Sequence, residues 1–503
     1  MSNGRRSIPV LIFHRDLGSQ QSPSRINTIS VELLSLIFRF SRADLRPHLG
    51  TVDLHRQNLS VVRITGVCRF WRDVAIGDAL LWSNISFSTS RPSTIKCAME
   101  FLRRSRGAMI TVQIFDIGNR ISYVAEIGDL MRKIAQQSDR IMRFEAVGLS
   151  SSIAEALISP ADNLAHLTIN GGAETLPLVF DGRMPRLKRL TLSNPTGWYL
   201  RTFPDITRVE LFGSGSHIHL SSLMSFLEGA VNLERLSLSR FQEFAPGRRM
   251  APGASIALPS LRELHIYLCH SQEILEYLEL PPSTRVSILS GHSPNTQHIL
   301  HCLPNAGSLY NHLFDTRTLT IALHPTDDEF YLVTRVSFDQ PKCFLQVHDD
   351  RGRFDGGWIL NSVEAIVDFK PFFNINTLNL SVEVCPVPWT EWLPQLSGLV
   401  NMDIHSVNIA ELVFALNRTH PQHGGPVCPS LRYISVEQRE SGPALNSSLL
   451  KSCLLARSQA GCSVSWLRLQ SWEWTPIDRA DLGWSVLIKS QGMLYAFSVF
   501  VYS

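Results

Sequence analysis

The most restrictive feature of the sequence is a short apolar motif that recurs along the chain, with three aliphatic positions separated by two residues and then by one. Its copies are Leu164-x-x-Leu167-x-Ile169, Leu187-x-x-Leu190-x-Leu192, Ile206-x-x-Val209-x-Leu211, Leu233-x-x-Leu236-x-Leu238, Leu261-x-x-Leu264-x-Ile266, Ile375-x-x-Leu378-x-Leu380, Leu399-x-x-Met402-x-Ile404 and Leu431-x-x-Ile434-x-Val436. The central residues of the first five copies, 167, 190, 209, 236 and 264, are 23, 19, 27 and 28 positions apart. Recurrence at such intervals predicts a stack of similar structural units.

The spacing inside the motif explains why the units must stack. The last two apolar residues lie on one face of a short strand, and the first packs the turn that leads into it. Each unit therefore has one bare face that only the next unit covers. The segments 219–231 and 271–280 have helical patterning and are expected to form an outer, convex layer. We predict an α/β solenoid, an irregular horseshoe with a parallel sheet on its concave face.

Within residues 268–373 the motif is weak. Val286 with Ile288, Leu319 with Ile321, and Val336 with Phe338 keep the alternation of a strand but lose the leading leucine. We interpret this region as degenerate repeats, with residues 342–357 as an inserted surface loop or hairpin.

The final segment contains Trp466-Leu467-Arg468-Leu469, further tryptophans (Trp472, Trp474, Trp484) and an apolar end, and is interpreted as a cap over the last repeat.

Residues 26–88 precede the repeats and have a helical pattern. In the first predicted helix, Leu33, Leu34, Ile37 and Phe38 share one side, and Val31, Leu36 and Phe40 extend the apolar surface. After a polar link over 41–60, a second helix is expected to carry Ile64, Val67, Cys68, Trp71 and Ala75 on one side and to stop at Gly77. About sixty residues form a marginal fold on their own, so surplus apolar surface indicates a partner.

This N-terminal segment resembles an F-box. Its opening residues match the family's L-P-x-E-L-L-x-x-I-F pattern, and Val67-Cys68-Arg69-Phe70-Trp71-Arg72 with Leu81-Trp82 match V-C-R-x-W-R and the closing L-W. Ser30 stands where the family usually has proline, and the 41–60 link resembles an insertion. The resemblance implies binding to the Skp-family adaptor of a cullin-RING ubiquitin ligase. The residues that would form or support that interface are Ile29, Glu32, Leu33, Leu34, Ile37, Phe38, Val67, Cys68, Trp71, Arg72, Leu81 and Trp82. A helical bundle of another kind is the alternative.

The repeat region resembles the leucine-rich-repeat domains that often follow an F-box, whose period is roughly 20 to 29 residues. It lacks the asparagine or cysteine of the regular consensus, so we expect uneven units. We predict four parts: a disordered leader over residues 1–25, an F-box-like helical domain over 26–88, a leucine-rich-repeat-like solenoid over 89–463 with a degenerate stretch at 270–373, and a C-terminal cap over 464–503.

Composition and charge argue against several classes of protein. The 47 basic and 44 acidic residues leave a net charge of +3, too close to neutral to predict nucleic-acid binding. Nine cysteines without a Cys-x-x-Cys pair argue against a disulfide framework and for a reducing compartment. The apolar runs 8–13 and 493–502 are too short for a signal peptide or a membrane span. We therefore expect a cytoplasmic or nuclear protein that binds neither nucleic acid nor membranes.

Motifs that would indicate an enzyme or a metal site are absent from the sequence. It has no Gly-x-Ser-x-Gly elbow, phosphate-binding glycine loop or His-Glu-x-x-His pair. His420 and His423 with Cys428 form the best metal-like grouping, but the surrounding prolines and glycines indicate an ordinary loop. Asp327-Asp328 and Asp349-Asp350 are expected to be solvated turns. We predict no catalytic residue, no metal and no cofactor.

Three arginines form the one candidate substrate-binding group. If the repeats stack in register, Arg189, Arg208 and Arg235 lie on adjacent strands, roughly 5 Å apart. Because Glu210, Glu234 and Glu263 are close in the sequence, one interpretation is a neutralised, solvated face. The other is a patch on the concave face that holds an acidic segment of a target through charge-assisted contacts.

Together these features predict an adaptor without enzymatic activity. The F-box-like helices would bind the Skp-family adaptor, and the repeats would bind a protein substrate whose identity the sequence does not reveal. Ubiquitin transfer would then be promoted by proximity. The alternatives are an interaction scaffold that binds the adaptor without ubiquitination, a repeat receptor for a non-protein ligand, and an enzyme with a site hidden in the degenerate region.

Overall fold

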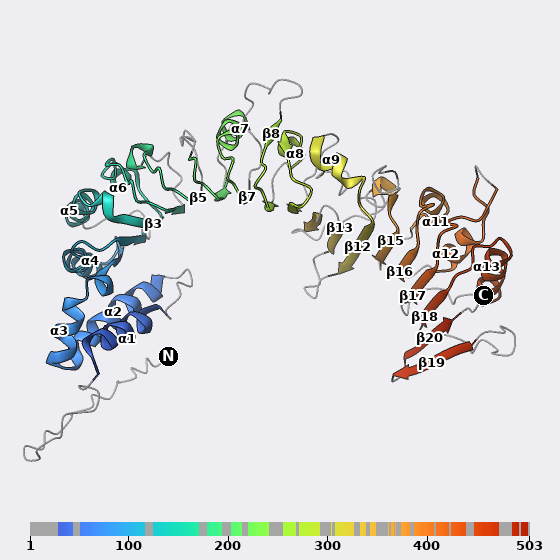
Figure 1. Ribbon diagram of the computed structural model, residues 1–503, viewed down its shortest axis with the longest axis horizontal. Coiled ribbons are helices and arrows are strands. Elements are labelled where there is room, and N and C mark those ends of the chain that lie inside the picture. Colours follow the sequence, from blue (N-terminus) through green and yellow to red (C-terminus); the bar gives the residue numbers. More distant parts are fainter. Residues whose placement is uncertain are drawn as a thin grey trace, which may run out of the picture. The chain divides into compact units, whose positions relative to one another are not determined.

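The computed structural model describes residues 29–43, 51–115, 124–170, 179–193, 203–213, 220–240, 255–267, 271–291, 303, 307–325, 332–338, 343–348, 361, 364–366, 368, 374–382, 387–406, 409–421, 424–438, 447–471, 485–491 and 494–500. The predictions for the leader, the two aspartate pairs, His423, and Trp472, Trp474 and Trp484 fall outside these residues. The chain divides into two compact units, Met1–Gln113 and Ile114–Ser503 (Figure 1). The four predicted domain boundaries remain predictions.

The first unit is a group of helices followed by a strand–helix–strand segment. Its elements are α1 (Val31–Ala43), α2 (Thr51–Val67), α3 (Arg69–Gly77), η2 (Ala79–Trp82), β1 (Asn84–Ser88), α4 (Pro92–Arg104) and β2 (Ile110–Phe115), inside which the division between the units falls. Two expectations are wrong here. The polar link over 41–60 contains the first ten residues of α2, and the predicted second helix is broken at Cys68. The break has a local cause, because Cys68 is extended and its Sγ accepts the backbone N–H of Trp71 at 3.4 Å as an N-cap.

Aromatic side chains hold the first unit together. Phe38 of α1 packs on Trp71 of α3 with ring centroids 5.0 Å apart, and Trp82 packs edge-to-face on Phe101 of α4 at 4.9 Å. The indole N–H of Trp82 donates to the carbonyl of Ala75 at 2.7 Å, so its polar atom is satisfied inside the core. Unit 1 thus has its own core, to which α1, α3, η2 and α4 all contribute.

The second unit consists of short strands connected by helices and turns. Its elements are α5 (Val124–Ala135), η3 (Ser138–Arg140), β3 (Ile141–Val147), α6 (Ser151–Ala154), β4 (His166–Asn170), η4 (Val179–Gly182), β5 (Arg189–Ser193), β6 (Arg208–Phe212), α7 (Leu220–Glu228), β7 (Arg235–Ser239), β8 (Ile256–Ala257), β9 (Glu263–Tyr267), α8 (Ser271–Leu275), β10 (Leu278–Glu279), β11 (Arg285–Gly291), α9 (Gly307–Leu313), β12 (Thr318–Pro325), β13 (Leu332–Phe338), β14 (Cys343–His348), β15 (Thr377–Val382), α11 (Trp389–Trp392), η7 (Leu393–Gln395), β16 (Asn401–Ser406), α12 (Ile409–Leu416), β17 (Tyr433–Gln438), α13 (Ser447–Gln459), β18 (Trp466–Ser471), β19 (Ser485–Gln491) and β20 (Leu494–Phe500).

One long, mostly parallel sheet joins these strands. Strands β3, β4, β5, β6, β7, β9 and β11 pair in parallel, each with the next, and β15, β16, β17 and β18 do the same. The pairing is in register with the repeats, since Leu190 faces Val209 and Val209 faces Leu236. The eight copies of the motif therefore lie on eight strands of this sheet, as predicted.

The order of the strands reverses in the middle of the sheet. β14 pairs in parallel with β11, β13 is antiparallel to both β14 and β12, and β12 pairs in parallel with β15. The strands β12, β13 and β14 thus form an antiparallel meander that joins the two parallel series in reverse chain order. The interpretation of this region as plain degenerate repeats is therefore incomplete. Residues 343–348 form a strand that pairs antiparallel with β13, the preceding strand, and parallel with β11. Of the two expectations for this segment, these residues fit the hairpin and not the surface loop.

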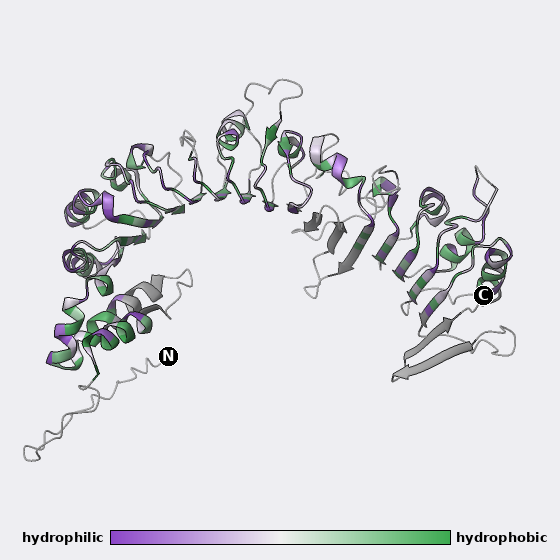
Figure 2. Cartoon of the chain, viewed as in Figure 1, coloured by the Kyte–Doolittle hydropathy of each residue, from purple (hydrophilic) through white to green (hydrophobic). Residues whose placement is uncertain are grey.

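The apolar residues of the motif form the core of the second unit. The leading residues Leu164, Leu187, Ile206, Leu233 and Leu261 are buried, as are the two inward positions of each strand. Bands of hydrophobic and hydrophilic residues alternate along β15–β18 in Figure 2. Helices such as α7 and α8 lie on one side of the strands (Figure 1), and α7 buries Leu223, Met224, Phe226 and Leu227. On the opposite face polar and charged side chains predominate, with Tyr433 and Trp466 as aromatic members on β17 and β18.

The architecture is an α/β fold built on this mostly parallel sheet. At its C-terminal end β18 continues the parallel series, and β20 and β19 add an antiparallel pair beside it. Within the part of the chain that the structure describes, no helix combines the length and apolar character needed to cross a membrane.

Candidate functional site

Helix α1 carries a row of apolar side chains that face solvent. Leu33, Leu36, Ile37 and Phe40, which follow the i, i+3, i+4, i+7 spacing of one helix face, are 56%, 45%, 49% and 65% exposed. Val31 on the same helix, Val62 and Val67 on α2, and Leu80 in η2 are also exposed. In Figure 2 hydrophobic residues are prominent on α1 and α2. We call Leu33, Leu36, Ile37 and Phe40 the α1 stripe. Contiguous apolar exposure of this kind is typical of a surface that another molecule covers.

The second apolar row of α1 faces the interior of the same unit. Leu34 and Phe38 are each 1% exposed and lie four residues apart, so they face α3 while the α1 stripe faces outward. The sequence pattern placed Leu33, Leu34, Ile37 and Phe38 on one side. The structure divides them between two adjacent rows with different environments.

The residues matched to the F-box pattern therefore fall into three groups. Glu32, Leu33, Ile37, Val67 and Arg72 are exposed; Ile29, Cys68 and Trp71 are partly exposed; Leu34, Phe38, Leu81 and Trp82 are buried. Only the first two groups are available to a partner, whereas the buried group supports the helices from within. The structure brings the exposed members Leu33 and Ile37 together on α1.

A buried carboxylate fixes α1 against the end of α3. The Nε and Nη2 atoms of Arg39 each donate to one carboxylate oxygen of Asp78 at 2.7 Å, and Asp78 is buried. Oδ1 of Asp78 also accepts the backbone N–H of Leu80 at 3.1 Å as the N-cap of η2. The hydrogen bonds to Asp78 raise the pKa of Arg39 further, so the guanidinium group keeps its charge. This contact joins α1 to the junction between α3 and η2.

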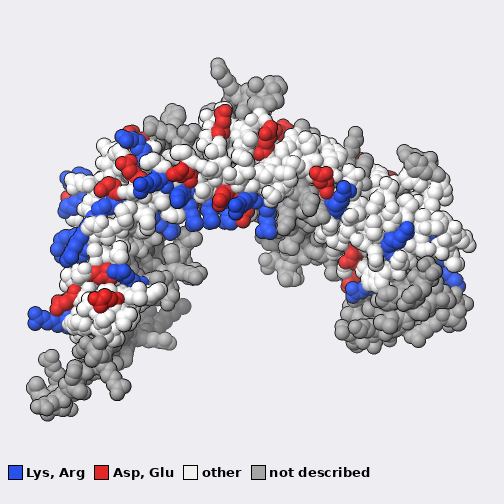
Figure 3. Space-filling view, in the orientation of Figure 1, with Lys and Arg blue, Asp and Glu red and all other residues white. Residues whose placement is uncertain are grey.

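The second candidate surface lies on the polar face of the sheet in the other unit. The strand pairings place Arg189 opposite Arg208 and Arg208 opposite Arg235, which confirms the predicted register. The same line of cross-strand partners continues through His166 to Arg143 on one side, and through Glu263 to Arg285 on the other. We call Arg143, His166, Arg189, Arg208 and Arg235 the basic row. Figure 3 shows Lys and Arg side chains gathered along the strands in this part of the sheet, with a few carboxylates among them.

The basic row is only partly neutralised. Arg235 forms an ion pair with Glu263 at 2.5 Å, and Arg143 pairs with Glu145 on its own strand. Within the described residues, Arg189 and Arg208 have neither an ion pair nor a side-chain hydrogen bond. Glu210 instead accepts the hydroxyl of Thr191 at 3.4 Å. Two cations on neighbouring strands repel each other by about 1 kcal/mol when water screens them. The central part of the row is therefore a site of unbalanced positive charge.

The titration of His166 reflects the same local field. Partial burial lowers the pKa of His166, and the positive charges of Arg189 and Arg143 on the flanking strands lower it further. The imidazole is thus kept neutral between two cations. The row consequently holds four permanent charges and one neutral ring that can donate or accept a hydrogen bond.

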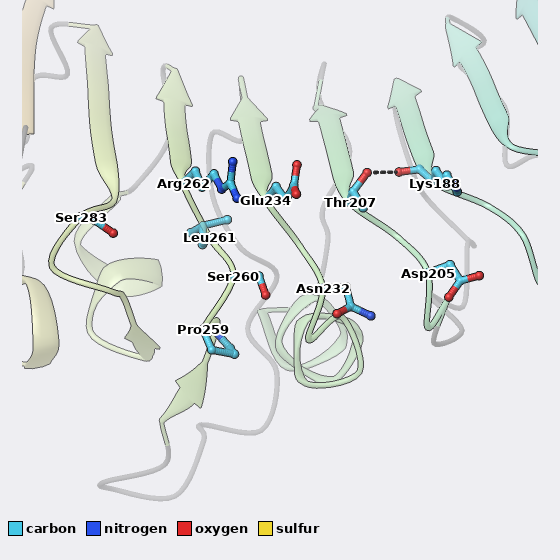
Figure 4. Close-up of a pocket in the computed structure, with 10 residues that line it drawn as sticks. All are labelled: Lys188, Asp205, Thr207, Asn232, Glu234, Pro259, Ser260, Leu261, Arg262 and Ser283. Carbon is cyan, nitrogen blue, oxygen red and sulfur yellow. Dashed lines mark hydrogen bonds between the residues drawn. The ribbon is translucent and has the colours of Figure 1, made fainter.

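A shallow groove of about 570 Å³ lies at the start of the same strands (Figure 4). Lys188, Thr207, Glu234 and Arg262 immediately precede β5, β6, β7 and β9, and they line the groove with residues of the preceding turns such as Asp205 and Asn232. The Thr207 hydroxyl donates to the Lys188 carbonyl at 3.1 Å. With both signs of charge present, the groove adds hydrogen-bonding groups beside the basic row but little net potential.

Farther along the sheet the polar face has a different character. Tyr433 and Trp466 are neighbours on β17 and β18, and with Asn379, Asn401 and Asp403 they line a second shallow hollow. The His405 ring, whose Nε2 lies 3.7 Å from Oδ1 of Asp403, acts together with Ser435 and the charge of Arg468 to keep the pKa of Asp403 low. His405 also lies 3.0 Å from Glu437 through its Nδ1. Because Arg468 also lines this hollow beside Asp403, the patch is aromatic and polar without an excess of either charge, so it differs from the basic row in the chemistry it offers.

Three members of the line of cross-strand partners were not predicted from the sequence: Arg143, His166 and Arg285. Each occupies the first position of a pattern in which Arg or His is followed by apolar-x-apolar, in R-F-E-A, H-L-T-I and R-V-S-I. Arg189, Arg208 and Arg235 have the same pattern in R-L-T-L, R-V-E-L and R-L-S-L. This pattern identifies these six positions of the line even where the leading leucine of the motif is absent.

The metal-like grouping near residue 420 is part of a turn. His420 Nε2 lies 2.9 Å from the carbonyl of Pro394, and the buried Cys428 thiol donates to the carbonyl of Leu393 at 3.2 Å. Burial raises the pKa of Cys428 to about 12, which disfavours the thiolate that a metal would require. Across the described residues, no group of three His, Cys, Asp or Glu side chains could hold an ion.

Comparisons with known proteins do not assign this chain to a family. No family model matches it, and no curated protein matches its sequence. Among solved structures it is similar to the one titled "Crystal structure of TLR13-ssRNA13 complex", with a TM-score of 0.25 and 13% sequence identity. The match covers 72% of this chain and 41% of that chain, so it spans less than half the length of the matched chain. Similarity at this level identifies neither a ligand nor a partner.

Proposed function

We propose that this protein is an adaptor of the F-box type, which binds a Skp-family adaptor through its first unit and a protein substrate through its second. The proposal is supported by the sequence pattern over residues 29–82 and by the α1 stripe. The sheet of the second unit supplies a long polar surface, consistent with a leucine-rich-repeat-like horseshoe. The chain would act by holding a substrate lysine near a charged ubiquitin carrier, which is catalysis by proximity.

The observation that carries the proposal is the exposure of the α1 stripe. Four large apolar side chains on one helix face are left in water although the same helix buries Leu34 and Phe38 against its own unit. Each large aliphatic side chain moved from water into an interface contributes about 1.5 to 3 kcal/mol. A groove that covered the stripe would therefore gain enough free energy for specific binding. Such helix-in-groove recognition uses this i, i+3, i+4, i+7 spacing.

The test measures binding of purified full-length protein to a purified Skp-family adaptor by calorimetry. We expect binding by the wild type and at least a hundredfold weaker binding by the double variant Leu33→Asp with Ile37→Asp, because two charges would have to be buried in an apolar interface. Both residues are exposed, so the variant should keep the circular dichroism spectrum and melting temperature of the wild type. The conservative variant Leu33→Met with Ile37→Leu should retain binding.

A matched control separates the stripe from apolar exposure in general. Ile158 in the second unit is 65% exposed, and Ile158→Asp should leave adaptor binding unchanged. Absence of binding by the wild type, or equal binding by the Asp double variant, would refute the proposed interface. Binding of the adaptor without recruitment of cullin in a reconstituted mixture would instead favour a scaffold outside ubiquitination.

A further inference from the structure

The polar face of β3–β7 has a chemistry that fits one kind of partner. Five adjacent strands place Arg143, His166, Arg189, Arg208 and Arg235 in a single line of cross-strand partners. All five side chains are exposed or half-exposed. The next outward positions on the same strands carry Glu145, Thr168, Thr191, Glu210 and Ser237, so hydroxyl groups and two carboxylates lie beside the cations. The surface therefore combines charge with hydrogen-bonding groups.

We propose that the basic row binds an extended, acidic segment of a partner protein, with Arg189 and Arg208 as its main anchors. These two arginines are the members without an ionic partner in the described part of the chain, whereas Arg143 and Arg235 are paired with carboxylates. An incoming carboxylate can form a two-point contact with a guanidinium group, which is the strongest geometry for this pair. The assignment of the segment to a ubiquitination substrate rests on the proposed function; the binding of an acidic segment does not.

The dimensions of the row fit a short extended peptide. Four steps between strands, each about 4.8 Å, give a row about 19 Å long, the length of about six residues of extended chain. Acidic side chains on one face of such a peptide recur about every 6.6 Å, which long arginine side chains on neighbouring strands can reach. His166, kept neutral between Arg143 and Arg189, provides a hydrogen bond to the peptide rather than a further charge. The groove beside Lys188 and Thr207 offers further hydrogen-bonding groups at the edge of the row.

Two features favour a protein segment over a nucleic acid. Single-stranded nucleic acid is usually held by aromatic platforms on which bases stack, and neither outward line of β3–β7 described above contains Phe, Tyr or Trp. Glu145, Glu210 and the neighbouring Glu263 interrupt the positive charge, which disfavours a ligand with a phosphate at every unit. A peptide with acidic residues at intervals needs no aromatic platform, and its uncharged residues can lie beside these carboxylates.

The test uses full-length protein and a fluorescent twelve-residue peptide of alternating Glu and Ser. Fluorescence anisotropy should show binding that weakens with added salt, and the matched peptide of alternating Gln and Ser should not bind. The double variant Arg189→Ser with Arg208→Ser should bind the acidic peptide at least tenfold more weakly. The charge-reversed variant Arg189→Glu with Arg208→Glu should lose the acidic peptide and gain the peptide of alternating Lys and Ser.

A control variant removes the same charge elsewhere in the second unit. Arg132 on α5 and Arg183 after η4 are both exposed and lie outside the strands. Arg132→Ser with Arg183→Ser lowers the net charge equally and should bind the acidic peptide as the wild type does. A loss of binding in this control would indicate a nonspecific charge effect and overturn the assignment to the row.

The remaining outcomes distinguish this inference from the proposed function. Unchanged peptide binding by the Arg189→Ser, Arg208→Ser variant would overturn the inference, whether or not the Skp-family adaptor binds. Tighter binding of a twelve-nucleotide single-stranded RNA that depends on the same arginines would indicate that the ligand of the basic row is a nucleic acid and not an acidic peptide. Peptide binding that depends on the row, in a protein that does not bind the adaptor, would support the inference and refute the proposed function.

Discussion

At the scale of single residues, Glu100 shows how a charge cluster stabilises the first unit. On α4 it accepts hydrogen bonds from Arg103 at 2.6 and 2.8 Å and from Arg104 at 2.5 Å. Arg104 also lies over the ring of Trp82, 4.3 Å from its centroid, so the cluster contacts the core. The hydrogen bond from Arg103, with the further contact from Arg104, lowers the pKa of Glu100 from 4.5 to about 2.

This shift predicts a pH dependence for the stability of α4. Because the pKa of Glu100 is lower in the folded state, its stabilising contribution is complete above about pH 4.5 and is lost as the pH falls toward 2. The side chain is 38% exposed, so solvent screening limits the contribution to about 1 kcal/mol. In Glu100→Gln, hydrogen exchange in peptides that cover α4 should be about fivefold faster than in the wild type at pH 7 and only about twofold faster at pH 3.

Asp73→Asn is a suitable control for the pH prediction. Asp73 on α3 is also near an arginine, at 4.0 Å from Arg69, but both side chains are largely exposed. Exchange in α4 should not respond to this variant at either pH. Equal acceleration by Glu100→Gln at pH 7 and pH 3 would contradict an electrostatic role and indicate a packing effect.

At the scale of elements, the like charges of the basic row destabilise the pairing of the strands that carry them. Arg208 on β6 faces Arg189 on β5 and Arg235 on β7, and like charges directly opposite each other destabilise a sheet. Replacement by threonine would remove the repulsion and introduce a β-branched residue that favours strands. We expect Arg208→Thr to stabilise this part of the sheet by about 0.5 to 1 kcal/mol, seen as two- to fivefold slower hydrogen exchange in β5 and β6. A stability gain combined with weaker binding is typical of a functional site.

Arg285→Thr tests whether charge repulsion is the reason. Arg285 occupies the equivalent position on β11, but its cross-strand neighbour on β9 is Glu263, of opposite charge. The same gain in strand propensity should be offset there by the loss of a favourable neighbour, so exchange in β9 and β11 should not slow. An equal gain in both variants would mean that propensity alone accounts for the effect.

The elements also show which features the sequence could predict. The repeat strands were predicted because two apolar residues at alternate positions must face the core of a stacked unit. Helix α2 was missed in part because its contacts are distant: Asn58 is buried and donates to the carbonyl of Ser86 at 2.7 Å. The break at Cys68 was missed because the apolar pattern continues through it. The pattern also could not distinguish Leu33 from Leu34, since adjacent rows of one helix are both apolar.

At the scale of the whole molecule, strand order is the feature that local patterns do not determine. The alternation at Val286, Leu319 and Val336 predicted strands, and strands are present. Their arrangement is set by pairing between distant segments, such as β11 with β14 and β12 with β15. The same applies to the line of cross-strand partners: its Arg and His members share a local sequence pattern, but the register of the complete sheet is what aligns Arg143, His166 and Arg285 with the three predicted arginines.

The division into two units predicts that the two proposed binding surfaces act independently. The α1 stripe belongs to Met1–Gln113 and the basic row to Ile114–Ser503, and each unit has its own buried core. Substitutions that share no partners usually have additive effects. The quadruple variant combines Leu33→Asp, Ile37→Asp, Arg189→Ser and Arg208→Ser. It should bind the adaptor as weakly as the double variant in α1 does, and the acidic peptide as weakly as the double variant in the basic row does. A deviation of more than about twofold from additivity, measured by calorimetry for the adaptor and anisotropy for the peptide, would show that the surfaces are coupled through the chain.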